Sequence, residues 1–89
     1  MTWRIDFSPA ALRSLENLDQ QVKKRILSFV HNRLAVRPNP RQLGEALQGK
    51  QFADTWRYRV GDYRVLAEIK DDIVTILVVE VGHRREIYR

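Results

Sequence analysis

The residues best suited to chemistry lie in the stretch VGHRREIYR, residues 81–89. His83 can carry a proton near neutral pH. Tyr88 has a phenol whose ordinary pKa of about 10 falls when guanidinium groups stand close to it. Arg84 and Arg85 add permanent positive charge. Metal-free cleavage of RNA needs such groups: a base for the 2′-hydroxyl, cations for the charge that grows on the phosphoryl oxygens, and an acid for the departing 5′ oxygen.

A second group of arginines lies in an alternating stretch, residues 56–60, which a Gly61-Asp62 turn signal separates from another alternating stretch, residues 63–70. In the hairpin that this pattern predicts, Arg59 lies opposite Arg64, and Arg57 lies on the same face. Directly opposed like charges destabilise a sheet by roughly 0.2–1 kcal/mol per pair. Guanidinium forks match phosphate oxygens two at a time, so this face is suited to phosphate.

The tail and the hairpin are expected to form one site. Val81 ends a strand that should run beside the one carrying Arg64, and Gly82 permits a bend that delivers Arg84 to the rim of the basic face. Simpler explanations remain open. The hairpin arginines could pair with nearby acids, His83 could be a surface residue, and Tyr88 could be an exposed terminal aromatic. The acids considered are Asp62, Glu68 and Glu80.

The sequence pattern also predicts the helices and strands that must position these residues. Their order indicates one α+β domain over residues 1–89. Alternation predicts a strand over residues 3–7. Ser8-Pro9 then predicts a helix start, and Asp19 caps a second helix with an apolar stripe up to Leu34. Residues 41–51 are expected to be a loop, with a short helical turn at 45–47.

Three antiparallel strands follow, of which the last, residues 73–81, is apolar at nearly every position and should be covered on both faces. The two helices are expected to pack together on one face of the sheet. Strand, two-helix hairpin and three-stranded antiparallel sheet therefore follow one another along the chain.

Composition limits the classes of function. The chain has 16 Lys and Arg against 11 Asp and Glu, a net charge of +5, which favours a polyanionic partner such as nucleic acid. It has no cysteine, its longest apolar run is four residues, and residues 1–10 do not resemble a secretory signal. We therefore expect a soluble cytoplasmic protein. No cluster of His, Asp and Glu has metal-ligand spacing, so neither a metal nor another cofactor is expected.

The stretches WRYRVGDYRVLAEI and ILVVEVGHRREIYR closely resemble the RelE branch of the RelE/ParE toxin superfamily, and GDYRV together with VGHRRE is the specific combination. The resemblance covers essentially the whole chain. It implies the toxin of a type II toxin-antitoxin system, an mRNA interferase that cleaves mRNA in the ribosomal A site without a metal. It also implies a RelB-like antitoxin, and operator DNA that is bound only through the antitoxin complex.

The same resemblance implies roles for residues. Arg64 and Arg84 would hold the scissile phosphate, and Tyr88 would activate the 2′-hydroxyl or stack on a base. Arg57 and Arg59 would bind RNA backbone at positions where some members have lysine. Our own additions are Arg85 as a further RNA contact and His83 as a proton carrier, since a guanidinium cannot replace a lysine in moving protons.

Two other functions fit the same residues. A ParE-like poison of DNA gyrase would share the fold without nuclease chemistry. A plain nucleic-acid-binding module would bind phosphates on the basic face and cut nothing.

Overall fold

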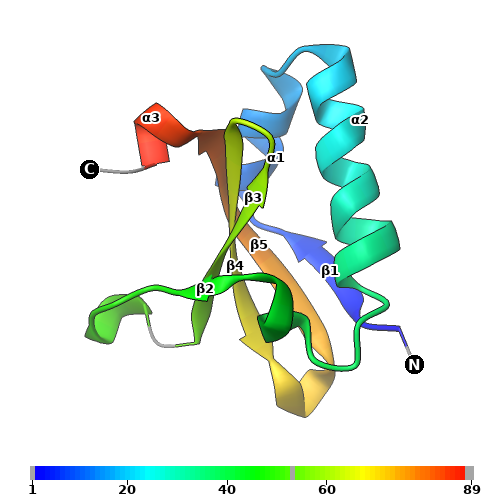
Figure 1. Ribbon diagram of the computed structural model, residues 1–89, viewed down its shortest axis with the longest axis vertical. Helices are drawn as coiled ribbons and strands as arrows, with labels where there is room; N and C mark the ends of the chain where they lie inside the picture. The colour runs from blue at the N-terminus through cyan, green and yellow to red at the C-terminus, as the bar shows by residue number, and fades with distance from the viewer. Residues whose placement is uncertain (1, 53, 88–89) are drawn as a thin grey trace.

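Five strands form one mixed sheet in the order β1-β5-β4-β3-β2 (Figure 1). The computed structural model describes residues 2–52 and 54–87. The predicted antiparallel arrangement of the last three strands is confirmed, and one strand extends it at each edge. β1 pairs with β5 in parallel, and β2 pairs with β3 antiparallel. The strands are β1 (Arg4–Phe7), β2 (Glu45–Ala46), β3 (Thr55–Val60), β4 (Tyr63–Lys70) and β5 (Thr75–His83).

The predicted helix starts are also confirmed. The Ser8 side chain accepts a hydrogen bond from the Ala11 N–H at 3.1 Å, and Pro9 is the first residue of α1 (Pro9–Glu16). Asp19 accepts from the Gln21 N–H at 3.1 Å and begins α2 (Gln20–Ser28). α2 continues into a wider π-helical segment, η1 (Phe29–Leu34). No helix among the described residues combines the length and the apolar character needed to cross a membrane.

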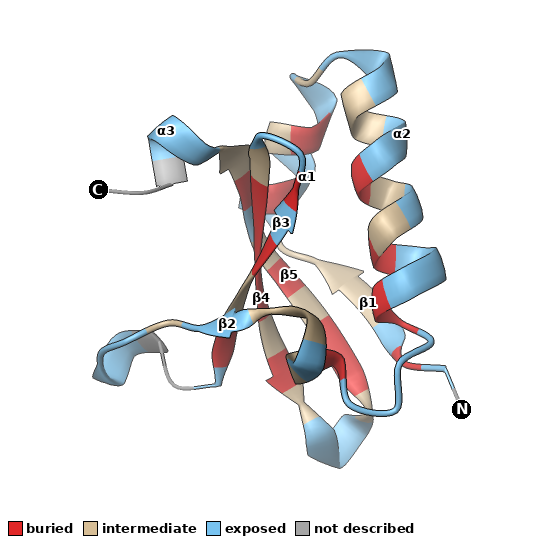
Figure 2. Ribbon diagram, in the orientation of Figure 1, coloured by how far each residue is buried: buried red, intermediate tan, exposed pale blue. Residues whose placement is uncertain are grey.

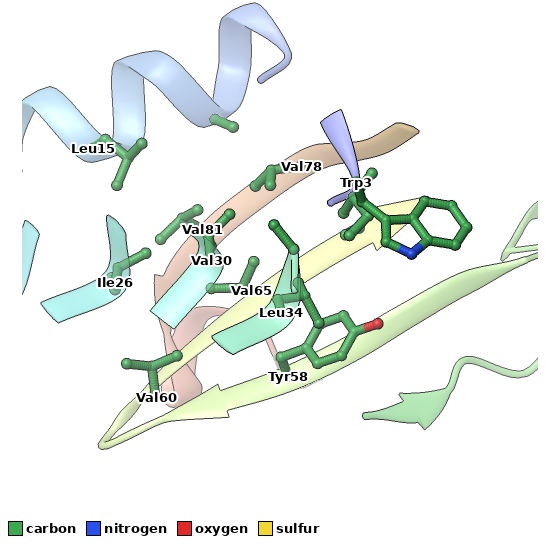
Figure 3. Close-up of a cluster of buried hydrophobic side chains, with 14 of the residues drawn as sticks. Trp3, Leu15, Ile26, Val30, Leu34, Tyr58, Val60, Val65, Val78 and Val81 are labelled. Carbon is green, nitrogen blue, oxygen red and sulfur yellow. The ribbon is translucent and has the colours of Figure 1, made fainter. Parts of the chain in front are cut away.

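Both helices pack on one face of the sheet, as predicted, and the buried side chains lie between the two layers (Figures 2 and 3). Complete burial of an aliphatic side chain stabilises the fold by roughly 1.5–3 kcal/mol, so this layer is the main source of stability. The labelled core residues in Figure 3 are Trp3, Leu15, Ile26, Val30, Leu34, Tyr58, Val60, Val65, Val78 and Val81.

β5 is an inner strand, but only its helix-facing side is fully covered. Leu77 and Val79 are half-buried and Glu80 is exposed. The expectation that both faces would be covered was wrong because apolar residues also occupy half-buried positions: buried Ile76 and Val78 alternate with half-buried Leu77 and Val79 in the apolar run. A β-bulge then changes the alternation, since Leu66 pairs with Glu80 while the next residue, Ala67, pairs with Val78. The skipped residue shifts the pattern by one position, so that Val81 is again buried in the core.

The segment before β3 also differs from the prediction. Residues 45–47 are not a helical turn, because Glu45–Ala46 is strand β2, and the helical turns lie on either side at Pro40–Leu43 and Lys50–Phe52. Gly44 makes the close approach of β2 possible: a Cβ on it would lie 2.6 Å from Cε1 of Tyr58. A two-residue strand is too short to show alternation.

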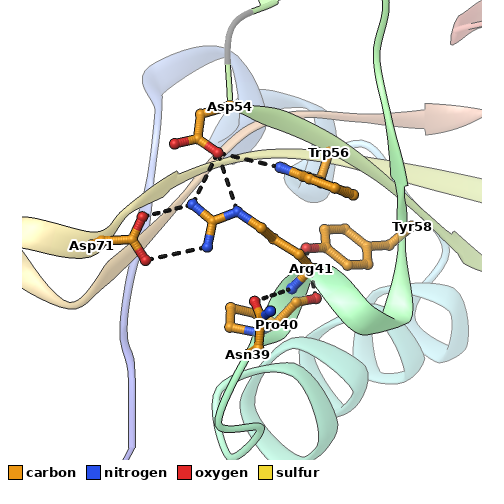
Figure 4. A network of polar contacts seen from close by, with 7 residues as sticks. All are labelled: Asn39, Pro40, Arg41, Asp54, Trp56, Tyr58 and Asp71. Atoms are coloured by element: carbon orange, nitrogen blue, oxygen red, sulfur yellow. Dashed lines mark hydrogen bonds and ion pairs between the residues drawn. The ribbon is translucent and has the colours of Figure 1, made fainter.

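Arg41 ties this segment to the sheet (Figure 4). Its Nη2 lies 2.9 Å from Oδ1 of Asp54 and 2.6 Å from Oδ2 of Asp71, in the turn between β4 and β5. The buried hydroxyl of Tyr58 donates to the carbonyl of Pro40 at 3.0 Å. These contacts hold the loop that carries β2 against the hairpin.

The ion pairs of Arg41 with Asp54 and Asp71 should make the stability of the fold depend on pH in the acidic range. The hydrogen bond from Arg41 holds the pKa of Asp71 below its ordinary value of 3.8. The ion pair therefore stabilises the protein fully above that pH, and the contribution disappears as pH falls through the lower folded-state pKa. We expect Asp71→Asn to lower the Tm by a few degrees at neutral pH. Below about pH 4 the Tm of this variant should fall less than that of the wild type, because the variant has no ion pair left to lose.

Thermal unfolding followed by circular dichroism across that pH range measures both effects. Asp72→Asn is the matched control, since Asp72 is exposed and forms no ion pair with any described residue. Equal acid sensitivity of the wild type and Asp71→Asn would show that the network does not contribute in this way.

Candidate functional site

Three arginines of the β3–β4 hairpin lie on the sheet face that points away from the helices. The predicted register is confirmed: Arg59 pairs with Arg64, and Arg57 pairs with Leu66. The alternate positions, Tyr58 and Val65, are buried in the helix-facing core. We call Arg57, Arg59 and Arg64 the arginine face.

The three arginines differ in exposure. Arg64 is only 7% exposed, and its Nη1 donates to the carbonyls of Gly61 at 3.1 Å and Tyr63 at 2.9 Å. Arg59 has 67% of its side chain exposed, and Arg57 has 20%. Arg64 thus places a fixed charge beneath the surface, where it also orients the turn, while Arg59 presents its guanidinium to solvent.

Glu45 is an acid that contacts the arginine face, and sequence reasoning missed it. Its Oε1 lies 2.8 Å from Nη2 of Arg57 and 3.9 Å from Nη2 of Arg59. The hydrogen bond from Arg57, with the positive charges around it, lowers the pKa of Glu45. No local pattern could have revealed Glu45, because it reaches this face only through the pairing of β2 with β3.

The tail meets the hairpin at its turn. The Arg84 N–H donates to the carbonyl of Asp62 at 2.8 Å, and Gly82 pairs with Arg64 across β4 and β5. The short helix α3 (Arg84–Ile87) therefore begins beside the hairpin tip (Figure 1). Arg84 and Arg85 are exposed there, whereas Tyr88 lies outside the described residues.

His83 caps α3. The Arg85 N–H donates to Nδ1 of His83 at 3.2 Å, and the His83 N–H donates to Oε1 of Glu86 at 3.2 Å. This reciprocal arrangement is a capping box with histidine in the place of serine or threonine. Since Nδ1 accepts a hydrogen bond, the proton of the neutral ring lies on Nε2. The ring also packs edge-on against Tyr63, with centroids 5.5 Å apart.

Substitution of His83 tests the cap. Asparagine is a strong N-cap residue, and its side-chain oxygen can accept the Arg85 N–H, whereas alanine cannot; loss of a cap costs about 1 kcal/mol. We expect the Arg85 amide to exchange with solvent at nearly the wild-type rate in His83→Asn and faster in His83→Ala. Hydrogen exchange followed by NMR measures this difference. Equal exchange rates at Arg85 in the two variants would show that the side chain at position 83 does not cap α3.

Comparison with known proteins gives consistent matches. Residues 5–88 match the family model described as the ParE toxin of the type II toxin-antitoxin system parDE. Toxin RelG from Mycobacterium tuberculosis (strain ATCC 25618 / H37Rv) is 30% identical over 89 residues, which cover 100% of this chain and 99% of the relative.

Solved structures give the same result. The toxin-antitoxin complex RelBE2 from Mycobacterium tuberculosis contains a chain with a TM-score of 0.84 and 26% identity, and the match covers 94% of this chain and 93% of that one. For a chain of the archaeal RelE-RelB complex from Pyrococcus horikoshii OT3, the TM-score is 0.74 and the sequence identity is 27%. That match covers 94% of this chain and 97% of the other. The isolated E. coli RelE toxin shares the fold, with a TM-score of 0.72 and 20% sequence identity. The match covers 91% of this chain and 83% of the toxin.

Proposed function

Because the chain belongs to the RelE/ParE superfamily of type II toxin-antitoxin toxins, we propose that it is a metal-independent endoribonuclease that cleaves mRNA in the ribosomal A site. The observation that carries this proposal is the junction between the tail and the arginine face. The Arg84 N–H is hydrogen-bonded to the carbonyl of Asp62, at the turn that Arg64 also holds. Two arginine-bearing segments that are distant in the sequence thereby meet at one turn, which supports the proposal.

The proposed reaction uses the RNA's own 2′-hydroxyl. The 2′-oxygen attacks the adjacent phosphorus, the bond to the 5′ oxygen breaks, and the products end in a 2′,3′-cyclic phosphate and a 5′-hydroxyl. Negative charge grows on the two non-bridging oxygens. Arg64 acts on this charge from beneath the surface and Arg84 from the rim, where fixed donors stabilise a transition state without having to reorganise.

In this proposal the Tyr88 phenolate takes the proton of the 2′-hydroxyl, and solvent supplies the proton for the departing 5′ oxygen. Arg84, Arg85 and Arg89, which are close to Tyr88 in the sequence, would favour the phenolate. Arg57, Arg59 and Arg85 bind the RNA backbone. Lysines that could exchange protons are absent from the hairpin positions, and the arginines there stay charged. For His83 to carry a proton in this proposal, the Arg85 N–H must first release Nδ1, because a neutral ring with its proton on Nε2 can accept another proton only at Nδ1.

The proposed partners are a RelB-like antitoxin, the ribosome and mRNA, with operator DNA reached only through the antitoxin complex, all in the cytoplasm. The antitoxin is supported by two similar chains that were solved in RelBE complexes. A net charge of +5 suits both an acidic antitoxin and RNA.

The test maps the 5′ ends of a reporter mRNA in a purified translation system. It compares wild-type protein, the double variant Arg64→Ala with Tyr88→Phe, and wild-type protein without ribosomes. The proposal expects new ends within codons that need both the ribosome and the two side chains. Absence of new ends with wild-type protein on translating ribosomes would overturn it.

A second candidate, inhibition of DNA gyrase, is favoured by the ParE description of the matched family. A parallel supercoiling assay with the same protein separates the two. Loss of supercoiling with intact mRNA would assign the toxin to gyrase.

A further inference from the structure

A second basic site lies between the hairpin tip and α2, beside the arginine face. A pocket of about 280 Å³ is lined by three arginines, Arg25, Arg33 and Arg59, and by no carboxylate. Arg25, Phe29 and Arg33 follow one another at spacings of four, so they form one row along α2 and η1. The remaining lining residues are Ser28, Val60 and Gly61.

Packing rather than acids holds the two helix arginines in place. A Cβ on Gly61 would lie 2.8 Å from Nη1 of Arg25, so this guanidinium contacts the backbone of the hairpin turn. Cζ of Arg33 lies 5.9 Å from the centroid of the Phe29 ring, a cation–π distance. Among the residues that the structure describes, neither Arg25 nor Arg33 is in an ion pair. The charges of Arg25 and Arg33 are therefore not neutralised by the described part of the protein, whereas Nη2 of Arg59 lies 3.9 Å from Oε1 of Glu45.

Arg59 connects this pocket to the arginine face. β2 covers β3 only at Trp56 and Arg57, so residues 58–60 form the sheet's edge. Arg59 lies on this edge, opposite Arg64 and at the wall of the pocket. Positive charge thus continues from the arginine face, around the edge of the hairpin, to α2.

The size and donors of the pocket indicate its ligand. Sites for small molecules usually measure about 300–1,000 Å³, so this pocket, at about 280 Å³, lies just below that range and suits a group as small as a phosphate with its sugar. The Ser28 hydroxyl accepts from Nδ2 of Asn32 at 3.2 Å, which leaves its own proton to donate. The pocket and the arginine face share Arg59, so successive phosphates of one strand could contact both. Guanidiniums pair with phosphate through two parallel hydrogen bonds.

We propose that the pocket formed by Arg25, Arg33 and Arg59 binds a backbone phosphate of single-stranded RNA, separate from the scissile phosphate. This inference rests on the proposed function for the identity of the strand. The pocket then fixes the path of the RNA around the hairpin edge, so that the scissile phosphate is held from one side while a neighbouring phosphate is held from the other.

The test measures binding of a 2′-O-methyl RNA oligonucleotide, which cannot be cleaved, by fluorescence anisotropy at several salt concentrations. The variant Arg25→Gln/Arg33→Gln is compared with Arg13→Gln/Arg37→Gln, which removes the same charge from exposed positions outside the pocket. Loss of one bound phosphate of a single strand should reduce the slope of log K against log salt by about 0.7. We expect the pocket variant to show about that reduction and to bind several-fold more weakly, whereas the control keeps the wild-type slope.

Equal slopes for the two double variants would overturn the proposal. Weaker binding to a RelB-like antitoxin with an unchanged RNA slope would also overturn it and would assign the pocket to an acidic protein segment. Arg25→Lys/Arg33→Lys should restore the slope, because it restores the charge. Failure of the nuclease proposal is seen separately in the mapping of mRNA ends, since the binding assay needs no cleavage.

Discussion

Replacing Arg64 with lysine is expected to slow mRNA cleavage by about 100- to 1,000-fold, the usual effect of removing one preorganised transition-state donor. Lysine keeps the positive charge but loses the planar fork. In the folded protein, Nη1 of Arg64 is fixed by the carbonyls of Gly61 and Tyr63, and this orientation allows the group to act without rearrangement. A flexible ammonium at the same position would be neither fixed nor bidentate.

The measurement is the rate of cleavage of a ribosome-bound message at saturating toxin. Arg59→Gln should have a much smaller effect at saturating toxin, because Arg59 is exposed and supplies binding more than orientation. Arg13→Gln on α1 serves as a neutral control. Since Arg64 is buried, thermal unfolding must first show that the lysine variant remains folded. A folded Arg64→Lys protein that cleaves at the rate of the wild type would remove Arg64 from the proposed site.

Replacing Gly44 with alanine should cost about 1–3 kcal/mol in the free energy of unfolding, the range for overpacking a filled site. The added Cβ would lie 2.6 Å from Cε1 of Tyr58 and 2.8 Å from the carbonyl oxygen of Arg57. Tyr58 cannot move away easily, because it is fully buried and its hydroxyl is bonded to Pro40. Urea-induced unfolding, followed by tryptophan fluorescence, measures the change.

A double-mutant cycle identifies the clash as the cause. In the Tyr58→Leu background the ring atoms that meet the new methyl group are gone, so Gly44→Ala should cost less there, although the contact with the Arg57 carbonyl remains. Equal costs in both backgrounds would contradict this packing argument. The variant should also displace β2 and so weaken the contact between Glu45 and Arg57.

Local signals in the sequence predicted the parts of the fold that depend on neighbouring residues. The Gly61-Asp62 turn fixed the hairpin register and therefore the common face of Arg57, Arg59 and Arg64. Ser8 and Asp19 marked the helix starts because capping involves residues only two or three positions apart.

Features that depend on distant residues were not predictable in this way. The pairing of β1 with β5, the two-residue strand β2 and the bulge opposite Leu66 and Ala67 are set by tertiary contacts. For the same reason the sequence did not reveal Glu45 at the arginine face, or Arg25 and Arg33 beside Arg59.

The parallel pairing of β1 with β5 has a consequence for the order in which the sheet forms. The Ser8 hydroxyl donates to the carbonyl of Val79, 71 positions further along the chain, and contacts at such separation form late because loop closure must come first. During synthesis the first strand and both helices have no complete sheet to pack on until β5 has been made. The sheet that supports the arginine face is therefore completed only after β5 has been made, so the arginines of the hairpin reach their final arrangement later than the helices that precede them in the chain.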